Sequence, residues 1–182
     1  IDTYAHNIRK IISSMGDAVA YFNSKGWLHR DVKPDNFLVS DDGTVKLIDF
    51  ALARRVQNAF MQMIMPKGKI QGTASYMSPE QIRGKGADSR SDVYSLGCAI
   101  YETLACRPPF TGNSMNDLLG KHLTAIAPPV SIANPNVTPE MANLLASAMA
   151  KRPEDRPESS AEFARLLHNT RPLRKIPDPP AD

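Results

Sequence analysis

Two carboxylates, an amide and a lysine near the start of the chain have the types and spacing of a phosphoryl-transfer site. Asp31, Lys33 and Asn36 lie close together, and Asp49 follows 18 positions after Asp31. Carboxylate and amide oxygens suit a magnesium ion that also holds phosphate groups. An ammonium group neutralises charge on a phosphoryl group in transfer, and a carboxylate without a metal can deprotonate a hydroxyl nucleophile. A charged surface turn explains the same residues, so spacing alone leaves both interpretations open.

A predicted β-hairpin brings these residues together. Residues 29–36 are charged and broken by a proline, which is typical of a loop. Short apolar runs at 37–39 and 45–48 follow, with an Asp-Gly step between them, and this pattern predicts two antiparallel strands. The second strand returns Asp49 to the side of the loop that holds Asp31.

The rest of the pattern is mostly helical. Apolar residues recur every three or four positions over 2–25. Residues 91–105 are apolar on most faces, which predicts a buried central helix with Ser91 as its N-cap. Residues 52–87 show no sustained period and are expected to form a long loop. The expected fold class is mainly α, α+β overall. Three shorter helices are expected at 114–123, after a Thr138 cap, and after a Ser159-x-x-Glu162 capping box.

Size and composition are those of one globular domain or part of one. The chain has 182 residues, of which 42% are apolar and 23% are charged. The net charge of +3 (22 basic minus 19 acidic residues) is too small to indicate nucleic-acid binding. Cys98 and Cys106 are expected to be reduced core thiols.

The ends of the chain bear on where it is expected to act. It starts without Met, which indicates a fragment, and shows no leader and no long apolar run. A cytoplasmic location is therefore expected, with no membrane contact within this chain, while a membrane anchor beyond residue 182 of a longer parent stays open.

Several ordered motifs resemble those of the eukaryotic-type (Hanks-type) serine/threonine protein kinases, in their bacterial form. They are HRDVKPDN at 29–36, DFA at 49–51, GTASYMSPE at 72–80, DVYSLG at 92–97 and RPPF at 107–110. The resemblance implies the large C-terminal lobe of a kinase over 1–168, helical with a small β-hairpin at the catalytic loop. It places a Pro-rich tail or linker at 169–182.

The resemblance also implies roles for single residues. Asp31 corresponds to the base that accepts the substrate hydroxyl proton, and Asn36 and Asp49 correspond to the magnesium ligands. Lys33 corresponds to the lysine that contacts the transferred phosphate, and Thr73 to the residue that bonds this lysine and the base in serine/threonine kinases. The implied cofactors are ATP and Mg²⁺. The implied partners are a protein substrate and the missing small lobe of the same kinase.

Other matched residues are expected to shape the site without taking part in chemistry. Leu38 would form the floor under the adenine of ATP. Asp92 would accept hydrogen bonds from the loop backbone, and Glu80 and Arg156 would form a buried ion pair. The expected structural residues are His29, Arg30, Phe50, Glu80, Asp92 and Arg156.

The chain departs from the family pattern in three ways. The small lobe is absent, so weak ATP affinity is expected for residues 1–182 alone. Ala51 stands where the family has a glycine, whose backbone freedom a Cβ restricts; the ligand role of the preceding aspartate is expected to survive. Residues 49–72 contain no Ser, Thr or Tyr, so the phosphate that often pairs with Arg30 has no acceptor there. The apolar stretch 59–65 is expected to order this segment by packing, or to dock a partner.

These observations predict a serine/threonine kinase lobe that, in the intact parent, transfers the γ-phosphoryl group of ATP to a protein hydroxyl. A truncated lobe or pseudokinase that acts as a protein-binding module is the first alternative. A small-molecule phosphotransferase is the second, although Lys33 and residues 72–80 favour a protein substrate. A nucleic-acid module is the third, and it lacks a concentrated basic face.

Overall fold

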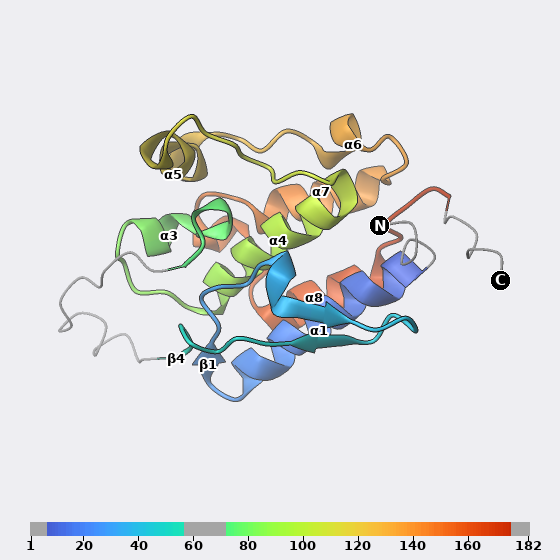
Figure 1. The fold of residues 1–182 in the computed structure, drawn as a ribbon, viewed down its shortest axis with the longest axis horizontal. Helices are drawn as coiled ribbons and strands as arrows, with labels where there is room; N and C mark the ends of the chain where they lie inside the picture. Colours follow the sequence, from blue (N-terminus) through green and yellow to red (C-terminus); the bar gives the residue numbers. More distant parts are fainter. Residues whose placement is uncertain (1–6, 57–71, 176–182) are drawn as a thin grey trace.

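The computed structural model describes residues 7–56 and 72–175 (Figure 1). Helices predominate, and the strands form two short antiparallel pairs, so the predicted fold class is confirmed. No helix within these ranges has both the length and the apolar character that a membrane span needs. The elements in chain order are α1 (Ile8–Ser24), β1 (Trp27–Leu28), η2 (Pro34–Asn36), β2 (Phe37–Val39), β3 (Val45–Leu47), β4 (Arg54–Arg55), η3 (Ala74–Tyr76), α3 (Pro79–Ile82), α4 (Ser89–Ala105), α5 (Met115–Thr124), α6 (Val130–Ala133), α7 (Pro139–Ala148), η4 (Pro153–Asp155) and α8 (Ser160–Asn169).

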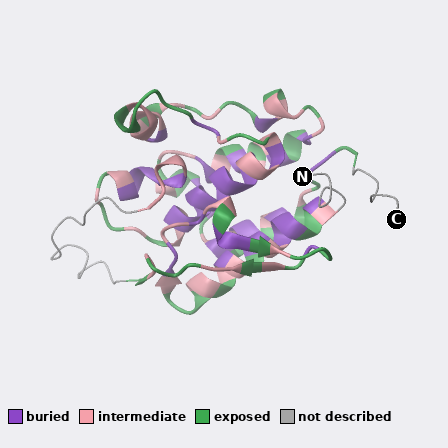
Figure 2. Ribbon diagram, in the orientation of Figure 1, coloured by how far each residue is buried: buried purple, intermediate pink, exposed green. Residues whose placement is uncertain are grey.

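Helix α4 forms the centre of the core, as its apolar composition predicts. Most of its residues are buried, and it packs against α1, α7 and α8 (Figure 2). The predicted N-cap, Ser91, is wrong. The helix begins two residues earlier, because the Asp88 carboxylate accepts a hydrogen bond of 2.8 Å from Arg90 N and so satisfies a free backbone donor. Ser91 lies in the first turn and faces the core.

Helices α1 and α8 lie side by side (Figure 1). Gly16 permits their close approach, because a Cβ at this position would lie 2.9 Å from Leu167 Cδ1 and 3.2 Å from Ala164 Cα. The helix predicted over 2–25 is present from Ile8 to Ser24, and residues 1–6 lie outside the described residues.

The predicted hairpin is present and packs on α1 (Figure 1). Strands β2 and β3 pair in register from Phe37 opposite Leu47 to Val39 opposite Val45. Gly43 has a φ of +77°, a left-handed conformation that glycine adopts without strain, so the turn can close over few residues. The hairpin therefore fixes where the chain re-emerges beside the loop at 29–36.

The expectation of a loop throughout 52–87 is wrong at both of its ends. Strand β4 pairs with β1, with Trp27 opposite Arg55, and Val56 N donates to Gly26 O at 2.9 Å. The short helices η3 and α3 lie at the other end. Two-residue pairings leave no periodic signal in a sequence. Residues 57–71, with the apolar stretch 59–65, lie outside the described residues.

Helices α7 and α8 begin at the caps that the sequence predicts, and α5 begins one residue after Ser114, where its helix is expected to start. The hydroxyls of Ser114, Thr138 and Ser159 accept hydrogen bonds from the backbone three residues further on, at 3.1, 3.2 and 3.1 Å. The capping box at Ser159 is only half formed, because the Glu162 carboxylate accepts from Glu158 N instead. Helix α6 has no counterpart in the sequence prediction.

The first part of the predicted tail packs on the lobe. Leu173 is 6% exposed and pairs with Val137. Thr138 N donates to Pro172 O at 3.1 Å, and Arg174 N donates to Asn136 O at 2.7 Å. Residues 170–175 thus belong to the folded body, and residues 176–182 lie outside the described residues.

The two cysteines differ, and the expectation of two core thiols is wrong for one of them. Cys98 is fully buried in α4, but Cys106 is exposed. Cys106 ends α4 in a left-handed conformation with a φ of 55°. A helix commonly ends with such a residue, and this turns the side chain out of the apolar stripe that precedes it.

Candidate active site

The buried carboxylate of Asp92 holds the start of the loop at 29–36. Its Oδ2 accepts from His29 N at 2.8 Å and its Oδ1 accepts from Arg30 N at 2.9 Å. Asn23 Nδ2 donates to the same Oδ2 at 2.8 Å. Burial raises the pKa of Asp92, and these three hydrogen bonds oppose that shift. Asp92 thus satisfies two consecutive backbone donors that would otherwise be buried without partners.

Asp31 lies between a lysine and the docking segment, the name used here for residues 72–80. Its Oδ2 is 3.0 Å from Lys33 Nζ, and its Oδ1 accepts from Thr73 N at 2.8 Å. Lys33 Nζ also donates to Thr73 Oγ1 at 3.0 Å. Burial acts to raise the pKa of Asp31, but the hydrogen bonds from Lys33 and Thr73 outweigh it and leave the pKa lowered. The carboxylate is therefore ionised at neutral pH, and the three predicted catalytic residues lie together.

Asn36 and Asp49 become neighbours through the hairpin. Ile48 N donates to Asn36 O at 2.9 Å, which places Asp49 immediately beside Asn36 along the paired backbones. Asn36 is buried, and its Nδ2 donates to Asp31 O at 2.7 Å. Asp49 has a φ of 61° and is exposed, and its Oδ1 accepts from Ala51 N at 3.3 Å.

The side-chain oxygens of Asn36 and Asp49 fit a magnesium ion that is also held by phosphate oxygens. The Asn36 amide is oriented by its Nδ2, and no hydrogen bond reaches its Oδ1 within the described ranges. The Asp49 carboxylate is exposed and makes one long hydrogen bond. Magnesium usually takes one or two protein oxygen ligands and completes its shell with phosphate and water. The oxygen groups of Asn36 and Asp49 meet that requirement, because the two residues lie at the same end of the β2–β3 pair.

The docking segment is tied to the loop by backbone contacts. A Cβ at Gly72, whose φ is +124°, would lie 3.1 Å from Arg30 O, so a glycine is needed for this close approach. Gln81 Nε2 donates to the same Arg30 O at 2.9 Å. Ser78 and Gln81 form the capping box that begins α3.

A buried ion pair joins the docking segment to the end of the lobe. Arg156 Nη1 and Nη2 donate to the two carboxylate oxygens of Glu80 at 2.8 and 3.0 Å, and the Arg156 side chain has no exposed surface. Ser91 Oγ donates to Glu80 Oε1 at 2.5 Å. Burial alone would raise the pKa of Glu80, but Arg156 and Ser91 lower it overall. The predicted pair is present, so both charges are matched.

Arg30 precedes the proposed base in a left-handed conformation, with a φ of 68°. Its Nη1 is buried and has no hydrogen-bond partner among the described residues. Burial lowers the pKa of Arg30, Arg54 acts in the same direction and Asp92 opposes them. Residues 49–72 offer no phosphate acceptor to Arg30, because they contain no Ser, Thr or Tyr.

The face above the loop carries exposed apolar side chains. Leu38 is 56% exposed on β2. Phe50 is 49% exposed, and its ring stacks on Phe22 with centroids 4.9 Å apart and contacts the His29 ring edge-on at 5.4 Å. His29 is itself buried, and its Nε2 lies 3.1 Å from Ile48 O. His29 thus connects the loop at 29–36 to Ile48 and Phe50 on either side of Asp49.

Sequence reasoning missed some residues that position the site. Asn23 bridges Asp92 and Trp27 O, and Tyr76 Oη donates to Glu102 Oε2 at 2.5 Å. These long-range contacts leave no local pattern. Gln81 could have been found, because Ser78-x-x-Gln81 is a capping-box sequence.

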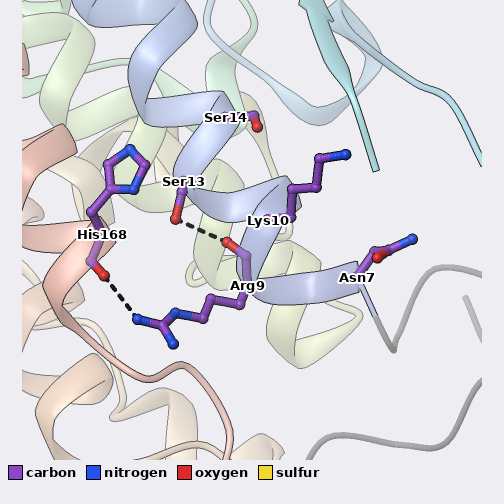
Figure 3. A pocket seen from close by; sticks show the side chains of 6 residues that line it. All are labelled: Asn7, Arg9, Lys10, Ser13, Ser14 and His168. Carbon is purple, nitrogen blue, oxygen red and sulfur yellow. Dashed lines mark hydrogen bonds between the residues drawn. The ribbon is translucent and has the colours of Figure 1, made fainter. Parts of the chain in front are cut away.

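A separate hollow of about 470 Å³ lies between the start of α1 and the end of α8 (Figure 3). Within it, Arg9 Nη2 donates to His168 O at 3.2 Å, and Ser13 Oγ donates to Arg9 O at 2.9 Å. None of the predicted site residues lines this hollow. It is therefore distinct from the cluster around Asp31.

Comparison with known proteins identifies the family to which this chain belongs. The family model described as the protein kinase domain matches residues 3–168. The chain belongs to the protein kinase family. The match covers the motifs at 29–36, 49–51, 72–80, 92–97 and 107–110.

Curated kinases are similar over most of this chain. PknL, a serine/threonine-protein kinase of Mycobacterium tuberculosis, is 44% identical over 83% of the chain and 37% of its own length. A probable serine/threonine-protein kinase PknB of Bifidobacterium longum is 42% identical over 81% of the chain and 21% of its own length. PknB of Mycolicibacterium smegmatis is 40% identical over 85% of the chain. The kinase chain described here thus spans well under half of the length of these relatives.

Proposed function

We propose that the protein is a serine/threonine kinase that transfers the γ-phosphoryl group of ATP to a protein hydroxyl with Mg²⁺. The observation that carries this proposal is the placement of Asp31 between Lys33 and Thr73, with Asn36 and Asp49 side by side next to it. This arrangement offers one carboxylate to the hydroxyl and a separate oxygen pair to the metal. The serine/threonine kinases named above support it.

Asp31 receives the substrate hydroxyl. The hydroxyl oxygen forms the new bond to phosphorus, the bond from that phosphorus to the bridging oxygen of the leaving ADP breaks, and the hydroxyl proton passes to Asp31. Because the pKa of Asp31 is lowered, its carboxylate is a weak base, and it orients the hydroxyl before it takes the proton late in the transfer.

Lys33 supplies the positive charge of the site, and Thr73 helps to hold that charge in place. Lys33 Nζ contacts both Asp31 and Thr73, so its ammonium is fixed where charge develops on the transferred group. Asn36 and Asp49 would hold Mg²⁺, which supplies charge neutralisation to the phosphates when bound. Thr73 ties this arrangement to the docking segment, which supports a protein substrate with a serine or threonine hydroxyl.

The exposed apolar face supports a further part of the proposal. Leu38 would lie under the adenine of ATP, and Phe50 would contact a small lobe. Both side chains are about half exposed, so a nucleotide and a second lobe would bury apolar surface there. A cytoplasmic location for the protein remains a prediction.

The test is phosphate transfer from labelled ATP to a serine or threonine peptide by the full-length protein. Asp31→Asn should lower kcat by about 100- to 10,000-fold, the usual contribution of a general base. Asp41→Asn is the matched control, because Asp41 is exposed in the hairpin turn and its side chain forms no ion pair within the described residues. Its kcat should stay within about twofold of wild type.

Two outcomes would contradict the proposal. Equal rates of phosphate transfer by the wild type and by Asp31→Asn would show that Asp31 is not the base. A folded wild type that transfers no phosphate to any peptide would favour the alternative of a protein-binding module.

A further inference from the structure

The small sheet formed by β1 and β4 has an open edge. It lies beside α1, and neither strand pairs with a third one in the part of the chain that the structure describes (Figure 1). Trp27 lies opposite Arg55, and Val56 N donates to Gly26 O at 2.9 Å. Hydrogen-bonded and non-hydrogen-bonded pairs alternate along an antiparallel sheet, so the N–H and C=O of Arg55 point away from β1. Both groups are therefore available to an additional strand.

Two cations at this sheet are held by aromatic rings instead of carboxylates. The Arg55 guanidinium lies 5.5 Å from the centroid of the Trp27 ring, and Lys25 Nζ lies 4.8 Å from that of the Tyr21 ring. Lys25 and Arg55 are exposed, and neither forms an ion pair with any described residue. An aromatic ring attracts a cation without neutralising it. The positive charge of this surface is therefore left for an anionic partner.

These charges decide which kind of strand the edge can receive. Arg54 and Arg55 are both exposed, so a second copy of the same edge would bring arginines against arginines. An acidic strand would instead place a carboxylate opposite Arg55, where the Cβ atoms of a cross-strand pair lie about 5 Å apart. A nucleic acid offers negative charge but no strand backbone to pair with the N–H and C=O of Arg55. Charge and backbone together therefore favour an acidic peptide.

We propose that the open edge of β4 binds an acidic, extended segment of a partner protein, which adds to β1 and β4 as a third strand. The N–H of Arg55 donates to a carbonyl of this segment, and the C=O of Arg55 accepts from one of its amides. An acidic side chain of the segment contacts the Arg55 guanidinium, and the next side chain along meets Val56, which is 46% exposed. This binding involves no phosphate transfer, so it is independent of the proposed kinase activity.

The first experiment titrates the purified protein with synthetic peptides of about eight residues in a calorimeter. One peptide alternates Glu and Thr, a second alternates Lys and Thr, and a third is the first with its glutamate nitrogens methylated. Methylation keeps the charge but removes the backbone donors that would face Arg55. The unmodified Glu-Thr peptide should bind at least about tenfold more tightly than either of the others. Equal affinity for the methylated peptide would overturn strand addition, and equal affinity for the Lys-Thr peptide would overturn the acidic partner. An oligothymidylate that binds as tightly as the Glu-Thr peptide would overturn the choice of a peptide.

The second experiment locates the bound peptide by amide hydrogen exchange. The Arg55 N–H gains a hydrogen bond, so its exchange should slow by at least about tenfold when the Glu-Thr peptide is saturating. The amides of β3, in the other sheet, are the internal comparison and should exchange at an unchanged rate. Protection elsewhere in the protein without protection at Arg55 would overturn the site.

A charge reversal tests the contact with Arg55. Arg55→Glu should bind the Glu-Thr peptide about tenfold more weakly than the wild type and the Lys-Thr peptide more tightly. Lys46→Glu is the matched control, because it makes the same charge change on β3, where Lys46 is exposed and forms no ion pair within the described ranges. Both of its affinities should stay within about twofold of wild type. An Arg55→Glu variant that binds both peptides as the wild type does, or loses both, would overturn the charge contact. The comparison of peptides on the wild type needs no variant, so misfolding of Arg55→Glu would not affect the first result.

Discussion

The two sides of the catalytic loop are built differently. On the inner side, Asp92 and Glu80 are buried and each makes three or more hydrogen bonds or ion contacts. On the outer side, Asp49 is exposed with one hydrogen bond of 3.3 Å, and Leu38 and Phe50 are about half exposed. The inner side thus holds the loop at 29–36 through buried hydrogen bonds, whereas the exposed side chains of the outer side are free to meet a ligand.

Removal of the buried ion pair should be the largest disturbance of the inner side. Glu80→Ala leaves the Arg156 guanidinium buried without a counter-charge, and the expected loss in the free energy of unfolding is about 3–5 kcal/mol. Urea denaturation measures it. Glu154→Ala is the control, because Glu154 pairs with Arg152 at the surface, and it should show no measurable change. Equal effects for the two variants would erase the contrast between buried and exposed contacts.

Acid should lower the free energy of unfolding through His122, which is buried against Tyr94 and Phe110. Burial lowers the pKa of His122 to about 4 in the folded state, while an unfolded histidine has a pKa of about 6.5. The unfolded chain therefore binds more protons between these values, and stability falls as pH drops through that window. The expected loss from His122 is on the order of 2 kcal/mol between pH 6.5 and 4.

Urea denaturation at several pH values tests this. A His122→Gln variant that still folds should lose much of the slope between pH 6.5 and 4. If the slope is unchanged in that variant, other groups carry it.

Truncation of one apolar side chain on each side sharpens the comparison. Val32 is fully buried in the loop and Leu38 is 56% exposed. Val32→Ala should lower the free energy of unfolding by about 1–3 kcal/mol through a cavity. Leu38→Ala should change it by no more than about 0.5 kcal/mol. Thermal melts of both variants provide the comparison, and a larger loss for Leu38→Ala would mean that the outer face is already covered.

Ala51→Gly should have the smallest effect. The non-glycine residues with a positive φ in the described ranges are Arg30, Asp49 and Cys106, so Ala51 does not occupy the left-handed region that glycine favours. Glycine would mainly widen the unfolded ensemble and cost about 0.5–1 kcal/mol. Phosphate transfer should stay within about twofold. A large gain in transfer from this change would show that the alanine restricts the backbone at 49–51.

Elements whose formation depends on a turn or a cap within a few residues could be predicted from the sequence. The hairpin follows from its Asp-Gly turn, and α7 and α8 follow from the caps Thr138 and Ser159. Features that depend on contacts between residues far apart in the sequence could not be predicted. The start of α4 depends on Asp88 rather than Ser91, and Leu173 is buried because Val137 lies opposite it.

The candidate site was predictable to the same degree. The residues of the loop could be singled out because their types match a chemistry, and the motif order added Thr73, Glu80 and Arg156. The contact of Asn23 with Asp92 spans 69 residues, and single-sequence patterns do not encode such a contact. The contact of Gln81 with Arg30 O spans 51 residues, and only the place of Gln81 in the capping box could have been read from the sequence.

The contact between Glu80 and Arg156 also constrains the order in which the chain can mature. The two residues are 76 positions apart, so the carboxylate leaves the ribosome long before the guanidinium that neutralises it. A nascent chain that has reached α7 cannot yet bury Glu80 without an uncompensated charge. The packing around Glu80 is therefore completed only after synthesis has passed Arg156.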